Sequence, residues 1–93
     1  MYVYMIMCRD GTYYTGVTND VDRRLAQHEA GNDPNAYTYS RRPLKLVYHQ
    51  IFNEPVAAIE FEKKLKKWSR KKKEALINGD FQNLPNLSKK KFK

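Results

Sequence analysis

The fold is decided by residues 2–31, which read YVYMIMCRDGTYYTGVTNDVDRRLAQHEAG. Tyr2 to Cys8 and Tyr13 to Val17 are rich in aromatic and β-branched residues, as strands are. Asp10-Gly11 lies between these runs, and an Asp-Gly pair in that position is a strong signal for a tight turn. The chain is therefore predicted to open with a β-hairpin.

The length of the hairpin loop decides which faces its tyrosines occupy, because side chains alternate along a strand. A two-residue loop at Asp10-Gly11 would point Tyr4 and Tyr14 to opposite faces of the sheet. A three-residue loop at Asp10-Gly11-Thr12, or a bulge of one residue, would place both tyrosines on one face. The sequence leaves both geometries open, and a site that uses both tyrosines requires the second.

A helix over residues 20–30 is expected after the hairpin. Thr18-Asn19-Asp20 supplies side-chain oxygens that can cap its N-terminus, and Gly31 is suited to end it. Arg24 and His28 are four residues apart, so they project together from one side of this helix. The pair is consistent with an ordinary surface pair or with a site that binds a phosphate.

A third strand is predicted over residues 44–51, after a loop over residues 32–43. Asn53 is a candidate cap for the next helix, and Pro55 is tolerated in the first turn of a helix. A last helix is expected over residues 70–78, with Ser69 as its cap and Gly79 at its end. The predicted fold is α+β, a three-stranded sheet with the order strand, strand, helix, strand, helix, helix.

The second of these helices carries an apolar stripe with a glutamate at its margin. Phe61, Leu65 and Trp68 recur at helical spacing and predict the buried face. Glu62 lies at the edge of that face, where a carboxylate is partly desolvated and is either paired or bound to a cation. Lys66, one turn further on, is an available partner.

Composition and charge limit the classes of protein to which the chain can belong. The 93 residues carry a formal net charge of +8, and 41% of them are hydrophobic. We expect one domain over residues 1–79 and a loosely ordered basic tail over residues 80–93. Cys8 is the only cysteine, which argues against a disulfide framework and favours a cytoplasmic or nucleoid-associated protein. The apolar run at residues 2–8 is too short to span a membrane.

The motifs together resemble those of the GIY-YIG nuclease family, in particular its small stand-alone bacterial members. Tyr2-Val3-Tyr4 stands where the family has Gly-Ile-Tyr, and Tyr14-Thr15-Gly16 stands where it has Tyr-Ile-Gly. The resemblance runs through most of the first 75 residues and implies a small antiparallel three-stranded sheet flanked by helices. Two positions depart from the family pattern, since Tyr2 replaces a glycine and Val17 stands where some relatives have a lysine.

The resemblance implies a metal-dependent endonuclease that hydrolyses nucleic-acid phosphodiester bonds. We favour DNA over RNA as the substrate, with structure-selective cleavage in repair or recombination. It assigns catalytic roles to Tyr4, Tyr14, Arg24, His28 and Glu62, with Glu62 holding a single Mg²⁺ or Mn²⁺. A free tyrosine has a pKa of about 10, so it needs nearby positive charge to act as a base at neutral pH. Of the two tyrosines we favour Tyr14 as that base. A polar residue that some relatives have late in the domain has Asn78 as its nearest counterpart.

Basic side chains elsewhere are predicted to bind the nucleic acid. Blocks of positive charge attract polyanions and make binding depend on salt. A nucleic-acid-binding protein without catalysis is the main alternative, and a module that docks on a protein or an acidic membrane is a third. A partner protein is one possible source of specificity. The predicted nucleic-acid-binding residues are Arg23, Arg41, Arg42, Lys63, Lys66, Lys67 and Arg70.

Overall fold

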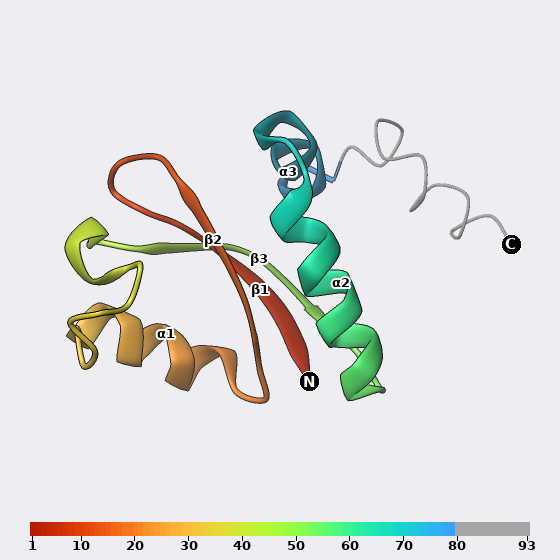
Figure 1. The fold of residues 1–93 in the computed structure, drawn as a ribbon, viewed down its shortest axis with the longest axis horizontal. Helices are drawn as coiled ribbons and strands as arrows, with labels where there is room; N and C mark the ends of the chain where they lie inside the picture. The colour runs from red at the N-terminus through yellow and green to blue at the C-terminus, as the bar shows by residue number, and fades with distance from the viewer. Residues whose placement is uncertain (80–93) are drawn as a thin grey trace, which may run out of the picture.

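The computed structural model describes residues 1–79. A three-stranded antiparallel sheet has the order β2-β1-β3, so that β2 is an edge strand. Figure 1 shows α1 on one side of this sheet and α2 with α3 on the other. The elements are β1 Tyr2–Met7, β2 Tyr13–Thr18, α1 Val21–Ala30, the short 3-10 helix η1 Tyr39–Arg41, β3 Lys45–Ile51, α2 Pro55–Lys67 and α3 Arg70–Ile77.

The hairpin between β1 and β2 places both tyrosines on one face. Tyr4 lies opposite Gly16, and Ile6 lies opposite Tyr14. The N–H of Gly11 donates to the carbonyl of Cys8 over 2.9 Å, and Gly11 has a φ of 84°, a conformation that glycine adopts without strain. The loop therefore spans three residues, 9–11, one residue earlier than the predicted loop at 10–12. The geometry that a joint site requires is nevertheless the one observed.

The hydrophobic core lies between the sheet and α2. Val3 and Met5 of β1 are fully buried there, together with Ala58 and Leu65 of α2. Leu76 of α3 closes the same cluster and is 3% exposed. Side chains that alternate with these on the strands face α1 instead, so the two sides of the sheet have different composition.

Helix α1 begins and ends as its sequence indicates. The Asp20 carboxylate accepts a hydrogen bond from the N–H of Arg23 over 3.1 Å, which satisfies one of the free donors of the first turn. Gly31 follows the last turn with a φ of 67°. Of the residues in α1, the one that the fold buries is His28, and Val21 and Leu25 remain half-buried.

The predicted elements are all present, and one cap differs. Residue Glu54, rather than Asn53, is the N-cap of α2, and its side chain makes no capping hydrogen bond. Pro55 has no N–H to satisfy, so the first turn needs a cap less than α1 does. The Ser69 hydroxyl caps α3 by accepting from the N–H of Lys72 over 3.3 Å.

The predicted basic tail, residues 80–93, lies outside the described residues. Within residues 1–79, no helix is long and apolar enough to cross a membrane.

Candidate active site

The glycine of the second tripeptide allows a tyrosine to lie flat against β2. Tyr4 is 2% exposed. A Cβ atom added at Gly16 would lie 2.6 Å from Tyr4 Cζ and would also collide with the hydroxyl oxygen. The close approach is therefore possible only without a side chain at residue 16.

The hydroxyl of Tyr4 leads into a short buried chain of polar groups. Tyr4 Oη lies 3.3 Å from Nε2 of His28, and Nδ1 of the same ring lies 2.7 Å from Oγ1 of Thr38. A neutral imidazole offers one donor and one acceptor, so both contacts are satisfied without a charge on the ring. Burial, followed by the positive charge of Arg24, lowers the pKa of His28.

Arg24 projects from α1 towards the two tyrosines. Burial raises the pKa of Tyr4, and the Arg24 guanidinium beside its hydroxyl opposes that rise. In turn, the interaction with Tyr4 raises the pKa of Arg24. Arg24 itself is exposed and donates to the side chain of Gln27 over 3.3 Å. Its guanidinium is therefore available to an incoming anion.

Tyr14 joins these residues from the edge of the sheet. Its ring meets the His28 ring edge-on, with centroids 5.2 Å apart. Its centroid lies 5.9 Å from that of Tyr37, and those two rings are stacked at an interplanar angle of 23°. Tyr14 is half-buried where Tyr4 is buried. Tyr14 is therefore the more accessible of the two tyrosines.

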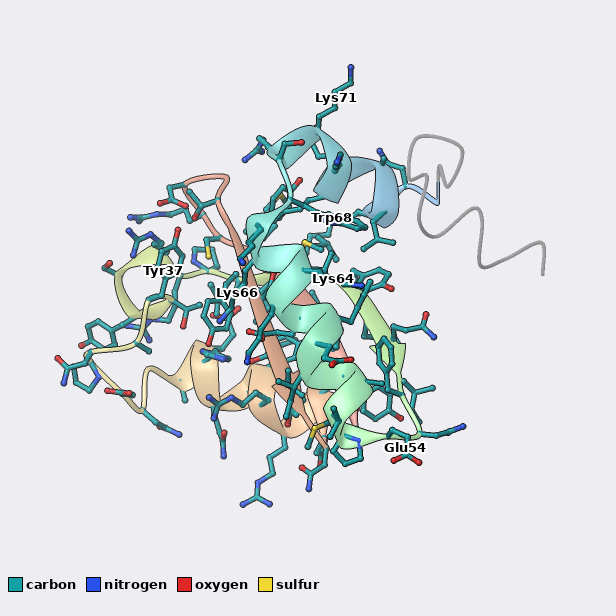
Figure 2. All side chains as sticks on the ribbon, turned by 45° about the vertical axis from the view of Figure 1, so that its right-hand side comes forward. Tyr37, Glu54, Lys64, Lys66, Trp68 and Lys71 are labelled. Carbon is teal, nitrogen blue, oxygen red and sulfur yellow. The ribbon has the colours of Figure 1, made fainter. Side chains whose placement is uncertain are left out.

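Glu62 approaches β2 from the other face of the sheet, on α2. It is 9% exposed, and Oε2 of its carboxylate lies 2.6 Å from Nζ of Lys66. The hydrogen bond with Glu62 raises the pKa of Lys66. Lys66 also lines a hollow of about 290 Å³ that Tyr14 borders. In Figure 2, Lys66 reaches from α2 towards the side of the molecule on which Tyr37 lies. Lys66 thus links Glu62 to the hollow beside Tyr14.

The donor set fits a divalent cation held by one carboxylate. Within residues 1–79, no group of three or more His, Cys, Asp or Glu side chains lies close enough to hold a metal together. Mg²⁺ commonly keeps several waters and takes only one or two carboxylates from the protein. A partly buried glutamate that already attracts a cation suits that role. Glu62 would hold the metal, and the ion pair between Lys66 and the Glu62 carboxylate would have to break first.

The predicted nucleic-acid-binding residues fall into two groups. Arg41, Arg42 and Arg70 are held by the protein itself. Arg41 bonds the Asp10 carboxylate over 3.1 Å, Arg42 donates to the backbone carbonyl of Glu29 over 3.1 Å, and Arg70 pairs with Glu74 over 3.1 Å. The arginine-rich loop is therefore largely packed against its own neighbours. The exposed members of the predicted set are Arg23, Lys63, Lys66, Lys67 and Arg70, of which Lys66 and Arg70 are paired.

Sequence reasoning missed one residue of this site, Thr38. Its side chain is 1% exposed and contacts His28. No local pattern marks Thr38, because it lies in an irregular loop between two tyrosines. The available signal was indirect, since a buried imidazole needs a partner on each nitrogen.

Comparison with known proteins identifies the class. A family model described as the GIY-YIG catalytic domain matches residues 1–75. The chain therefore belongs to the GIY-YIG family, which is a family of nucleases. The predicted resemblance and the predicted three-stranded antiparallel fold are both confirmed.

The relatives of this chain within the GIY-YIG family are small UPF0213 proteins. UPF0213 protein BH0048 of Halalkalibacterium halodurans is 41% identical over 90 residues, which cover 94% of this chain and 95% of that protein. A UPF0213 protein of Halobacterium salinarum is 48% identical over 76 residues, or 82% of this chain and 97% of that one.

Two solved structures share the fold. The solution NMR structure of BH0048 from Bacillus halodurans has a TM-score of 0.54 and 43% identity, and covers 83% of this chain and 81% of its own. The solution NMR structure of EF2693 from E. faecalis has a TM-score of 0.60 and 32% identity, and covers 87% of this chain and 85% of its own.

Proposed function

We propose that this protein is a metal-dependent endonuclease that hydrolyses phosphodiester bonds, with DNA as the substrate. The observation that carries the proposal is the convergence of Tyr4, His28, Arg24 and Tyr14 on the α1 face of the sheet, while α2 brings the buried Glu62 to the opposite face. Ordinary packing gives no reason to bury a histidine between a tyrosine and a threonine. Positioned polar groups of this kind are typical of an active site.

Tyr14 is the better candidate for the general base. Burial raises the pKa of Tyr4, which disfavours its phenolate form. Tyr14 is more accessible and borders the hollow that Lys66 lines. The cationic side chains of Lys66 and Arg24 both lie near Tyr14. In the proposed reaction, Tyr14 takes a proton from the attacking water, and Tyr4 with His28 fixes the surrounding geometry.

Arg24 and Glu62 would stabilise the reacting phosphate. A guanidinium can bind two phosphate oxygens at once and so stabilise the charge that develops in the transition state. Glu62 would hold Mg²⁺ or Mn²⁺, which supplies charge stabilisation at the leaving oxygen when bound. We place the reaction in the cytoplasm, in repair or recombination, with a partner protein as a source of specificity.

A second candidate function rests on the ion pair. The Glu62 carboxylate is already neutralised by Lys66 at 2.6 Å, and a protein that only binds nucleic acid would have no need to exchange that lysine for a metal. Such a protein would bind the same substrates and leave them uncut.

The deciding experiment compares the wild type with Glu62→Gln on labelled duplex, single-stranded, flap, splayed-arm and four-way DNA, and on RNA, with Mg²⁺ or Mn²⁺. Glu60→Gln is the matched control, because Glu60 lies on the same helix and is exposed. We expect metal-dependent cleavage by the wild type and by Glu60→Gln, and loss of at least a hundredfold in Glu62→Gln with binding retained (about 3 kcal/mol). Absence of cleavage throughout, or equal cleavage by all three proteins, would favour the binding protein instead.

A further inference from the structure

A hollow on the α2 side of β2 combines positive charge with hydroxyl groups. It has a volume of about 290 Å³ and lies between the edge strand, α2 and α3. Two lysines line it, Lys66 of α2 and Lys73 of α3. Its remaining lining residues are Tyr13, Tyr14, Thr15 and Tyr37.

Thr15 contributes a buried hydroxyl that has no partner. The residue is 3% exposed, and among residues 1–79 no group is placed to form a hydrogen bond with its Oγ1. It lies opposite Met5 in the sheet, so it faces α2, where the surrounding residues are largely apolar. A buried polar atom without a hydrogen-bond partner carries a free-energy penalty. Because Thr15 lines the hollow, its hydroxyl is a candidate to bind a ligand there.

Lys73 contributes a partly buried cation without a counter-ion. Burial lowers the pKa of its ammonium group. In the described part of the chain, no carboxylate lies within ion-pair distance of it. The nearby Glu74 is engaged by Arg70 over 3.1 Å and accepts from the Tyr13 hydroxyl over 3.4 Å. The hollow therefore has unbalanced positive charge at Lys73.

We propose that this hollow binds a phosphate of the nucleic-acid substrate that neighbours the phosphate to be cut, through Lys73, Lys66 and the Thr15 hydroxyl. The inference rests on the proposed function for the identity of the substrate. Tyr14 lines the hollow and its ring also contacts that of His28, so the two phosphates would be adjacent along one strand. Exchange of Lys66 for a metal at Glu62 would release the Lys66 ammonium to this second phosphate.

A phosphate is favoured over other ligands by the chemistry of the lining. A phosphodiester accepts hydrogen bonds and ion pairs and donates none, which matches two ammonium groups and an unpaired hydroxyl. Free inorganic phosphate has the same chemistry. The two sources are distinguished by comparing binding of DNA with binding of inorganic phosphate alone.

The test measures DNA binding without metal, so that it does not depend on cleavage. We expect Lys73→Met to lower the slope of log affinity against log salt by about one unit. Thr15→Val keeps the shape and removes the hydroxyl, and we expect it to weaken binding about fivefold while the protein becomes no less stable to urea. Lys71→Met is the matched control, since Lys71 lies on the same helix, is exposed, and does not line the hollow. Figure 2 shows Lys71 pointing away from Lys66 and Tyr37, which do line it.

The outcomes separate this inference from the nuclease proposal. Weakened binding in Lys73→Met and Thr15→Val, but not in Lys71→Met, supports the phosphate site even if no variant cleaves any substrate. Equal effects of Lys73→Met and Lys71→Met would show general charge attraction and would overturn it. So would unchanged DNA binding in Thr15→Val, or chemical-shift changes at Thr15 and Lys73 on titration with inorganic phosphate that DNA does not reproduce.

Discussion

Gly16→Ala tests the contact on which the arrangement of the tyrosines depends. The added methyl group would lie 2.6 Å from Tyr4 Cζ, and Cβ atoms essentially never come within 3.0 Å of another heavy atom. The Tyr4 hydroxyl oxygen is nearer still. Tyr4 is 2% exposed and cannot swing into solvent, so its ring or β2 must shift by at least about 0.6 Å. Overpacking of this kind costs about 1–3 kcal/mol, against a gain of about 0.4–1 kcal/mol from a less flexible unfolded chain.

We therefore expect Gly16→Ala to lower the free energy of unfolding in urea by about 1–2 kcal/mol. It should also lengthen the 3.3 Å contact between Tyr4 and His28 and reduce any cleavage. A double-mutant cycle with Tyr4→Leu gives the control, because leucine leaves room for the methyl group. In that background the cost of Gly16→Ala should largely disappear. A cost below about 0.5 kcal/mol in the wild type, or the same cost in both backgrounds, would refute the steric explanation.

Two further predictions concern the buried histidine. Thr38→Val should cost about 1–3 kcal/mol in urea unfolding because it leaves Nδ1 of His28 buried without a partner, and Thr38→Ser should recover most of that loss; equal stability of the two variants would contradict the observed contact. The pKa of His28 is lowered in the folded protein, first by burial, so the unfolded chain takes up a proton first as the pH falls below 6.5. The free energy of unfolding should therefore decrease from about pH 7 to pH 5. His28→Gln should flatten that decrease. His49→Gln is the control, because His49 is exposed, and we expect it to show the same decrease as the wild type. The same pH profile in all three proteins would rule out His28 as the source of the decrease.

The hairpin shows how far sequence alone could lead. The two strands and the turn at Asp10-Gly11 follow from residue types, and the structure has them in place. Which face Tyr14 occupies did not follow, because the same Asp-Gly pair fits a two-residue or a three-residue loop. A difference of one residue reverses the face. The resemblance to a nuclease family required both tyrosines on one face, but the residues of the turn did not distinguish between the two loop lengths.

The packing of α1 explains a second gap. Its apolar stripe is thin, since Val21 and Leu25 are half-buried. The helix buries His28 instead, a polar side chain whose partners come from β1 and from an irregular loop. Periodicity detects apolar faces and has no signal for a polar group buried by distant partners. The caps and the stripe were therefore predictable, whereas Thr38 and its contact were not.

The position of β2 at the edge of the sheet accounts for the composition of the site. The Tyr4, His28 and Arg24 side chains come from the α1 face, whereas Glu62, Thr15 and Lys73 come from the α2 face. A central strand would keep these two groups apart, because each of its edges is covered by a neighbour. Beside an edge strand, a single ligand can contact both faces, and Tyr14 lies at that boundary. An unpaired edge also invites pairing with another strand. A protein partner that added a strand to β2 would therefore block the site, while a nucleic acid that lies along the same edge would use both faces at once.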